Sequence, residues 1–308
     1  ITTYWLENIM DWNISRQIVW GIQIPAWKCV KCDNWEITDG VIPNKCSKCD
    51  SEKLARDTDT FDTWFSSSQW PFAVLKVNPS LDFNSFYPTS VMETAYDILP
   101  IWVIRMIMMG LYVTEKVPFK DVVIHGLVRD REGQKISKSK GNVIDPIIMT
   151  QKYGSDALRI SLIWGALIEN DIALSEDNVR GQRNFINKIW NASRFVMQFT
   201  KLAEKNVHFE TKINNIIDKT ADHLENFRLN QAIELLYSEF WHWFCDEAIE
   251  EAKLGKIGSD QMRTGLETFL KLLHPFAPFV TEAIWKEIKT LRKYPETLLI
   301  SSLWPAHT

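Results

Sequence analysis

The chain has 308 residues, a length that corresponds to about two domains and suffices for a hydrophobic core. Apolar residues make up 45% and charged residues 24%, which excludes general disorder, and 12 glycines and 12 prolines exclude collagen-like and low-complexity classes. The net charge of -4 argues against a nonspecific DNA-coating protein, which needs a basic surface, but it leaves room for a local basic patch.

The amino-terminal part predicts neither export nor membrane insertion. Residues 1–20 contain Glu7 and Arg16 and have no small-residue cleavage site of the kind that ends a secretory signal. The most apolar stretch, Ile98 to Val113, is interrupted by Arg105 and is shorter than the roughly 20 residues needed to cross a bilayer. It predicts a buried helix, so we expect a cytoplasmic chain with no membrane partner.

Four of the five cysteines follow the spacing C-x2-C-x13-C-x2-C. Two cysteines separated by two residues can point their thiolates at one ion, and two such pairs complete a tetrahedron around zinc. Two disulfides are the alternative, which a reducing compartment disfavours. Four protein ligands leave no open position, so the zinc would be structural. The ligands are Cys29, Cys32, Cys46 and Cys49, whereas the remaining Cys245 lies among aromatic residues and predicts a buried thiol.

A strand, a turn and a cationic loop follow in the middle of the chain. Residues 121–129 are β-branched and apolar, which favours a buried strand, and residues 130–133 form a turn signal. The next segment has three lysines within residues 135–140 and is bracketed by Gly133 and Gly141. Such ammonium groups can stabilise a departing polyphosphate, although most Lys/Ser runs are solvated surface loops.

The rest of the chain has a helical pattern. Pro146 opens a helical stretch that residues 153–155 divide into two short helices. From residue 176 onward apolar residues recur with helical spacing, and Gly, Asn and Pro separate the segments. The predicted helices cover residues 177–204, 214–225, 228–254, 260–273 and 278–292.

One face of the helix predicted around residues 180–196 is rich in arginine and asparagine. At about 100° per residue, five polar positions fall within an arc of roughly 80°, opposite an apolar side. Asparagine is a poor helix former, and Arg and Asn suit phosphate and base-edge contacts, so nucleic acid is a candidate partner. A solvated surface stripe is the alternative. The polar positions are Arg180, Asn184, Asn187, Asn191 and Arg194, and the apolar side is Phe185, Ile189, Ala192 and Val196.

Several segments resemble one known family. Residues 135–139 (KISKS), followed by 141–146 (GNVIDP), are similar to the KMSKS signature of class I aminoacyl-tRNA synthetases. Residues 59–67 (DTFDTWFSS) resemble the valyl version of a segment that carries Asp-Ser-Gly in isoleucyl enzymes. Further matches to the valyl-tRNA synthetases follow in order at residues 13–17, 20–21, 24–27, 93–99, 105–110, 240–246 and 273–278.

The resemblance implies a nucleotide site that uses ATP with Mg. Lys135 and Lys138 would hold the ATP phosphates during valine activation, and Lys138 matches the family's ATP-contacting lysine. Ser137 and Ser139 would shape the loop. Ile136 replaces the signature methionine, an apolar exchange of the kind that protein interiors tolerate.

The resemblance also assigns residues around the adenylate and the amino acid. Glu93 and Asp97 match a segment that holds the adenylate, with Asp97 an acceptor for ribose hydroxyls; the alternative is that both are helix-start residues. His125 and Gly126 end the strand where family members approach adenine, and a structural histidine is the alternative. The walls of the amino-acid pocket would be Trp64 and Trp102, two indoles that form a slot for a small branched side chain, unless they are plain core residues.

Two features of the family have no counterpart in the sequence, the HIGH motif and the editing insertion. We therefore expect a chain that binds zinc and tRNA(Val) but activates valine poorly or not at all unless the amino-terminal half is supplied, for instance as a separate polypeptide. Ala95 stands where the family usually has glycine, close to the expected nucleotide.

The sequence thus predicts an α/β region, the second half of a Rossmann-like class I catalytic domain, followed by an all-α anticodon-binding bundle. We place the catalytic part at residues 1–175, with the zinc knuckle at 29–49 and the KMSKS-type loop at 135–139, and the bundle at 176–308. The predicted function is that of a monomeric valine--tRNA ligase acting on valine, ATP and tRNA(Val). A noncatalytic tRNA-binding protein, an isoleucyl enzyme and a zinc-knuckle binding module remain alternatives.

Overall fold

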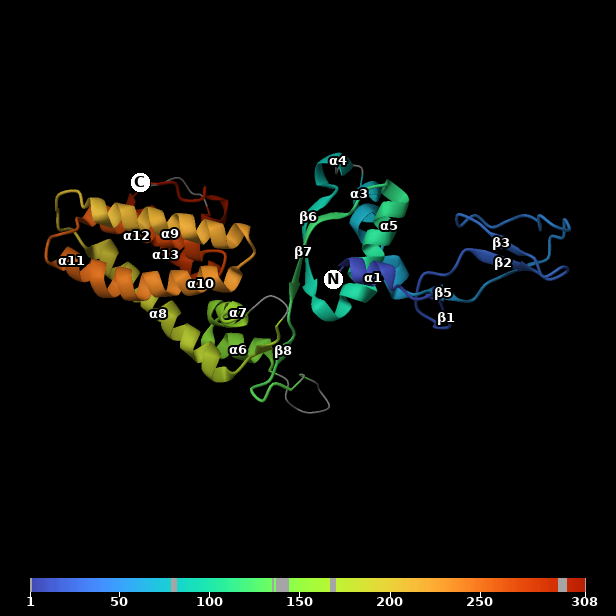
Figure 1. Ribbon diagram of the computed structural model, residues 1–308, viewed down its shortest axis with the longest axis horizontal. Helices are drawn as coiled ribbons and strands as arrows, with labels where there is room; N and C mark the ends of the chain where they lie inside the picture. The colour runs from blue at the N-terminus through green and yellow to red at the C-terminus, as the bar shows by residue number, and fades with distance from the viewer. Residues whose placement is uncertain are drawn as a thin grey trace. The chain divides into compact units, whose positions relative to one another are not determined.

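The protein, described by a computed structural model over residues 2–78, 82–134, 136, 144–166, 170–292 and 298–307, divides into two compact units. They are Ile1–Ile124 and His125–Thr308. The first contains short strands and helices and the second is mostly helical, so the expected order of an α/β region before a helical region is confirmed (Figure 1).

Short strands dominate the amino-terminal half of the first unit. They are β1 (Ser15–Arg16), β2 (Ala26–Cys29), β3 (Trp35–Ile37), β4 (Leu54–Arg56) and β5 (Thr60–Phe61). β2 is the centre of an antiparallel sheet in the order β3-β2-β4, in which Trp27 lies opposite Glu36 and Arg56. β1 pairs with β5, which leads directly into helix α2 (Thr63–Ser67).

Helices and one strand pair make up the rest of the first unit. They are α1 (Thr2–Glu7), α3 (Trp70–Val77), α4 (Phe83–Phe86), β6 (Thr89–Ala95), the 3₁₀ turn η1 (Tyr96–Ile98), the π-helical turn η2 (Leu99–Val103), α5 (Ile104–Thr114) and β7 (Phe119–His125). β6 pairs with β7. Leu99, Val103, Met106 and Ile107 form one small core with Phe119 of β7.

The apolar stretch that predicts a buried helix is buried on one side. Tyr96–Thr114 is helical and is long and apolar enough to cross a membrane, a property it shares with core helices of soluble proteins. In its most apolar window, 28% is buried within the part of the chain that the structure describes. Met106 is fully buried whereas Met108, Leu111 and Tyr112 are exposed, so the prediction of a buried helix holds for one face only.

The second unit begins where the predicted strand over residues 121–129 breaks. Gly126 and Leu127 separate β7 from β8 (Val128–Arg129), and β8 pairs in parallel with β9 (Ile172–Ala173). Helices α6 (Pro146–Tyr153) and α7 (Ser155–Ile163) lie between these strands in sequence and are divided at Gly154, as predicted. Gly154 has a φ of 92°, in the positive region that glycine adopts without a steric penalty.

The remaining helices surround one core. They are α8 (Glu176–Gln198), α9 (Val207–Glu225), α10 (Leu229–Ser238), the π-helical η4 (Glu239–Ala248), α11 (Ile249–Lys253), α12 (Ser259–Leu273), α13 (Pro278–Arg292) and the 3₁₀ turn η5 (Leu299–Ser301). The helix predicted over residues 228–254 is one continuous helical stretch with a π-helical middle. α9 begins at Val207 rather than at residue 214, because the side chain of Asn206 caps it by accepting the N–H of Phe209.

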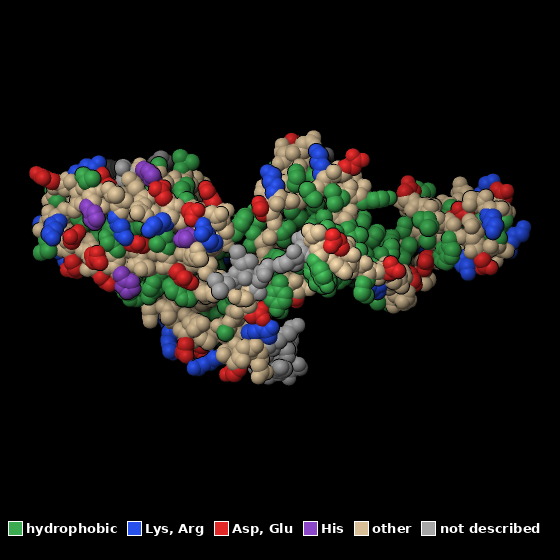
Figure 2. Space-filling view, in the orientation of Figure 1, with side chains coloured by type: hydrophobic (Ala, Val, Ile, Leu, Met, Phe, Trp, Pro, Cys, Tyr) green, Lys and Arg blue, Asp and Glu red, His purple; other side chains and the backbone are tan. Residues whose placement is uncertain are grey.

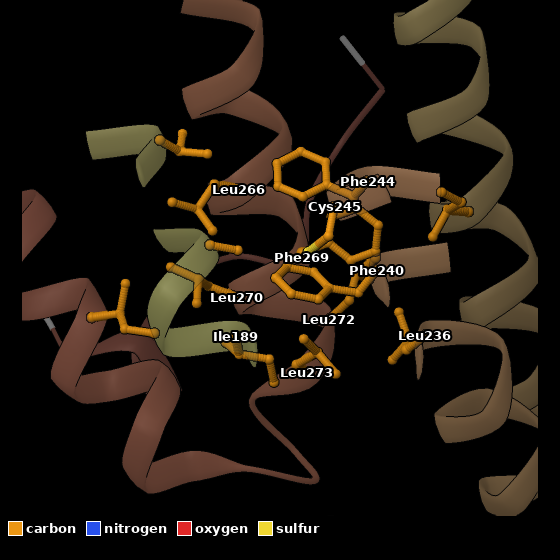
Figure 3. Packing of buried hydrophobic residues seen from close by; sticks show 14 of the residues in the cluster. Ile189, Leu236, Phe240, Phe244, Cys245, Leu266, Phe269, Leu270, Leu272 and Leu273 are labelled. Atoms are coloured by element: carbon orange, nitrogen blue, oxygen red, sulfur yellow. The ribbon is translucent and has the colours of Figure 1, made fainter. Parts of the chain in front are cut away.

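Aromatic side chains dominate the core of the bundle (Figure 3). Phe240 and Phe244 of η4 lie 5.5 Å apart between ring centroids, and each lies 5.2 Å from Phe269 of α12. All three are fully buried, and Cys245 lies in the same cluster. Burial raises the pKa of the Cys245 thiol to about 12, which keeps it protonated and confirms the predicted buried thiol.

Candidate functional site

The four cysteines of the paired motif converge on one point. Their Sγ atoms all lie within 4.8 Å of one another, with separations of 3.6 Å between Cys29 and Cys49 and between Cys32 and Cys46. Four sulfurs bound at about 2.3 Å to a tetrahedral zinc ion would lie about 3.8 Å apart, so the donor set and its spacing fit zinc. The alternative of two disulfides does not fit, because all four cysteines are free.

The two cysteine pairs are copies of one turn. The sequence Lys-Cys-x-Lys-Cys-Asp occurs at residues 28–33 and again at 45–50. In each copy the N–H of the aspartate donates to the carbonyl of the first cysteine at 3.0 Å, and the aspartate has a φ near 60°. The first lysine pairs with the same aspartate, at 3.1 Å for Lys28–Asp33 and 2.6 Å for Lys45–Asp50. The cysteine spacing alone missed this repeat, which the flanking Lys and Asp reveal.

The thiols of the knuckle differ in acidity. Burial opposes ionisation of Cys29, but the backbone N–H groups of Cys32 and Lys31 favour the thiolate and lower its pKa to about 6. For Cys32 the N–H of Asn34 favours the thiolate, but burial and the other three sulfurs outweigh it and raise the pKa to about 12. A metal ion bound here would need all four thiolates and would release the remaining protons.

Trp64, a candidate wall of the amino-acid pocket, lies on the five-residue helix α2. Asp62 is the N-cap of this helix, and its Oδ1 accepts the backbone N–H of Trp64 at 2.9 Å. Its Oδ2 accepts the indole N–H of Trp12 at 3.0 Å and pairs with the guanidinium of Arg16. Since a helix this short is not stable alone, these contacts determine where Trp64 lies.

Asp62 is 4% exposed and remains ionised. Burial would raise the pKa of its carboxyl, but the two N–H donors from Trp12 and Trp64 and the nearby guanidinium groups hold the pKa below its usual value. One of these guanidinium groups is that of Arg105, which lies over the ring of Trp12 with its Cζ 3.6 Å from the centroid. A buried, ionised aspartate with two cationic neighbours thus supports the start of α2.

Trp102, the second candidate wall, approaches the other end of α2. Its indole N–H donates to the backbone carbonyl of Ser67 at 3.3 Å. The structure therefore brings Trp102 to the helix that carries Trp64, and both side chains are half-buried. The Asp62 cap and the Trp102 contact fix the two ends of one short helix.

Glu93 and Asp97 lie close in sequence but on different elements of the first unit. Glu93 is an exposed residue of strand β6, so the alternative that it is a helix-start residue is wrong. Asp97 is exposed in the first turn of η1, where that alternative still applies.

His125 and Gly126 lie at the end of β7, in the second unit. The Nδ1 of His125 is 2.8 Å from the carbonyl oxygen of Gly126, and the imidazole is exposed. Gly126 is buried against backbone: a Cβ at this position would lie 1.8 Å from the carbonyl oxygen of Asn170. Only glycine fits there. The neighbouring Asp171 accepts the N–H of Leu127 at 2.7 Å and pairs with Arg129, which joins this junction to β9.

The predicted phosphate-binding residues Lys135, Ser137, Lys138 and Ser139 lie outside the described residues. The turn before them is closed by two hydrogen bonds. Asp130 and Gln134 are joined by an N–H to carbonyl hydrogen bond of 3.0 Å, and the Asp130 carboxylate accepts the N–H of Gln134 at 2.7 Å. After residue 143, Asp145 caps α6 by accepting the N–H of Ile147 at 2.8 Å.

The polar face predicted on α8 is exposed. Arg180, Asn184, Asn187, Asn191 and Arg194 are all exposed, and the opposite residues Phe185, Ile189, Ala192 and Val196 are buried. Arg180 forms an ion pair of 2.7 Å with Asp177 one turn away. Cationic and anionic side chains are interspersed over the bundle on the face drawn in Figure 2.

Two family models match successive parts of the chain. The family described as tRNA synthetases class I (I, L, M and V) matches residues 2–175, and the anticodon-binding domain of tRNA ligase matches residues 207–308. Valine--tRNA ligase of Geobacter sulfurreducens is 43% identical over 96% of the chain, and that of Clostridium tetani is 44% identical over 98%. The chain spans 36% of the length of each of these relatives.

Among solved structures, the ternary complex of Agrobacterium radiobacter K84 agnB2 LeuRS with tRNA and LeuAMS has the same fold. The TM-score is 0.79 at 21% identity, over 97% of this chain and 43% of that chain.

Proposed function

The chain belongs to the class I tRNA synthetases, and from this premise we propose that it is a portion of a valine--tRNA ligase. The whole reaction would join valine to ATP with release of pyrophosphate and then transfer the aminoacyl group to the terminal adenosine of tRNA(Val). The observation that carries the proposal is the identity of 43% and 44% with valine--tRNA ligases over nearly the whole chain.

Valine would lie between Trp64 and Trp102. The contacts at both ends of α2, from Asp62 to Trp64 and from Trp102 to Ser67, support this assignment because they fix the helix that carries Trp64 and bring Trp102 to it. A slot between two rigid indoles accepts a small branched side chain and resists a longer one.

ATP, with Mg, would be held by the residues that the resemblance to the family assigns to the nucleotide. Lys135 and Lys138 would neutralise the phosphates, with Ser137 and Ser139 shaping the loop, and Gly126 would lie near the adenine. Asp97, exposed at the start of η1, would accept ribose hydroxyls. Glu93 and His125 are the other residues that we assign to binding of the adenylate.

The tRNA would bind along α8. Its exposed Arg and Asn side chains offer charge to phosphates and amides to base edges, while the buried side anchors the helix in the bundle. We propose residues 176–308 as the anticodon-binding part and residues 1–175 as the catalytic part, in a monomeric cytoplasmic protein.

Zinc would be held by Cys29, Cys32, Cys46 and Cys49. Four thiolates fill the coordination shell, so the ion would stabilise the fold of the knuckle and activate no water. Spectroscopic titration of the reduced chain with Co²⁺ tests this directly, because a four-thiolate site gives intense charge-transfer absorption that Cys46→Ser should weaken.

Catalysis is tested by replacing the matching segment of the Geobacter sulfurreducens enzyme with residues 1–308. The expected result is valine-dependent exchange of pyrophosphate into ATP, which Lys138→Ala lowers by about 100-fold or more, since it removes a charge aimed at the leaving phosphates. Lys116→Ala, which removes the same charge from an exposed position outside residues 133–141, is the matched control. Exchange that depends on isoleucine, or a graft that binds tRNA and activates no amino acid, would contradict the proposal.

Binding to tRNA is tested on the chain itself by filter binding over a salt series. Arg194→Ala should weaken binding and lower the salt slope by about one, because one phosphate contact is lost. Lys219→Ala, which removes the same charge from an exposed position of α9, should leave both unchanged. Equal losses of tRNA affinity in the two variants would mean that α8 has no special role in binding tRNA.

A further inference from the structure

Glu36 links the two cysteine turns, the first knuckle (residues 28–33) and the second knuckle (residues 45–50), through a single oxygen atom. Its Oε1 accepts three hydrogen bonds, from the side-chain amide of Asn34 at 2.8 Å, the backbone N–H of Ser47 at 2.8 Å and the hydroxyl of Ser47 at 2.9 Å. Asn34 follows the first knuckle and its carbonyl accepts the N–H of Cys29 at 2.8 Å. Ser47 lies between the two cysteines of the second knuckle.

The second knuckle needs such a link on its amino-terminal side. On its carboxyl-terminal side it is fixed by β4, in which Leu54 pairs with Cys29, and by the hydrogen bond from Val30 N–H to the carbonyl of Lys53 at 3.0 Å. On its amino-terminal side it follows residues 38–45, an irregular loop without a strand. Glu36 therefore determines how Cys46 enters the site.

Geometry and charge act in opposite directions here. A carboxylate beside four thiolates opposes their ionisation, so its charge alone would weaken a metal site. Three donors on one oxygen, however, neutralise much of that charge and fix the position of Ser47, the neighbour of Cys46. The contribution of Glu36 to metal affinity must then come from the position that it gives to Ser47.

We propose that Glu36 is a positioning residue of the four-cysteine metal site: it holds the second knuckle against the first before the ion binds. The inference rests on the proposed zinc site. For this role Glu36 needs its acceptor oxygen and does not need its negative charge, so the two can be separated by substitution.

The experiment measures zinc affinity of the reduced, metal-free chain by competition with a chromophoric chelator. Glu36→Ala should raise the Kd by about 10–100-fold, the usual effect of removing a group that orients a ligand. Glu36→Gln keeps an acceptor oxygen and should bind close to wild type. Glu52→Ala, an exposed glutamate beside the same knuckle, is the control and should match wild type.

Two results of the affinity measurement overturn the inference. One is a Kd of Glu36→Ala equal to that of Glu52→Ala. The other is Glu36→Gln binding as weakly as Glu36→Ala, which would assign the effect to charge. At saturation with Co²⁺, Glu36→Ala should show the four-thiolate spectrum of wild type, and a spectrum with fewer thiolates would also refute the positioning role. A wild-type chain that binds no zinc would remove the metal site itself.

Discussion

The carboxylate of Asp156 on α7 accepts the backbone N–H of Val280 on α13 at 2.7 Å, across 124 positions of sequence. The same carboxylate accepts the N–H of Phe279 at 3.2 Å, so a side chain from α7 caps the start of another helix. One turn later Arg159 donates to the carbonyls of Pro275 and Phe276. Helix α7 thus contacts both the first turn of α13 and the two residues that precede Ala277.

Asp156→Ala should destabilise the second unit by about 1–2 kcal/mol, because α13 loses the cap for two N–H groups. Urea denaturation followed by the far-UV signal measures the change. Glu287→Ala, an exposed residue of α13, is the control and should stay within about 0.5 kcal/mol of wild type. An equal loss in both variants would mean that the contact from α7 does not stabilise α13.

Asp156→Asn should change how stability depends on pH. Burial raises the pKa of Asp156 above its usual value of 3.8, although Val280 and Phe279 oppose the shift. The folded state therefore binds the proton of the Asp156 carboxyl more tightly than the unfolded state does. The stability that this protonation contributes is fully present below the pKa of the unfolded state and is lost as the pH rises through the pKa of the folded state. Unfolding free energies measured upward from about pH 4 should fall less steeply in the variant. Identical slopes would refute the effect.

Asp62→Ala should lower the stability of the first unit by about 1–3 kcal/mol, because the indole N–H of Trp12 and the guanidinium of Arg16 lose a buried acceptor. Thermal unfolding of the variant and of Asp11→Ala, an exposed aspartate beside Trp12, gives the comparison. The pKa of Asp62 is lowered, so its contribution is present above the usual carboxyl pKa and is lost as pH falls. A variant as stable as Asp11→Ala would show that the carboxylate does not support α2.

Gly126→Ala should disrupt the junction of β7 and β8 and cost about 1–3 kcal/mol or more, since the new methyl group would overlap the backbone of Asn170. Gly181→Ala makes the same change on α8, where nothing lies within 4 Å of the added carbon. That control should gain about 1 kcal/mol, because alanine favours a helix over glycine. Denaturant titration of both variants should show opposite signs, and a neutral Gly126→Ala would refute the packing.

Features set by local pattern could be predicted from the sequence. The α6–α7 division at Gly154 and the start of α13 at Pro278 follow from turn and helix-start signals. The cysteine spacing predicted the cluster because each pair is a local turn. The buried and exposed sides of α8 followed from helical periodicity.

Features that depend on distant contacts could not be predicted. Gly126 marks the break within residues 121–129, but its close approach to the backbone of Asn170 cannot be predicted from that local pattern. The cap from Asp156 joins segments 123 or more residues apart. The roles of Asp62 and Glu36 likewise depend on partners that only the folded chain brings near.

The duplicated knuckle makes the cysteine cluster divisible into two equivalent halves. Each hexapeptide brings its own pair of sulfurs, its own Lys–Asp brace and the same backbone turn. Synthetic peptides of residues 28–34 should therefore assemble two to one around a single ion, with no need of the intervening loop. Besides the positioning by Glu36, the rest of the chain would add proximity, turning an encounter between two molecules into the closure of one ring.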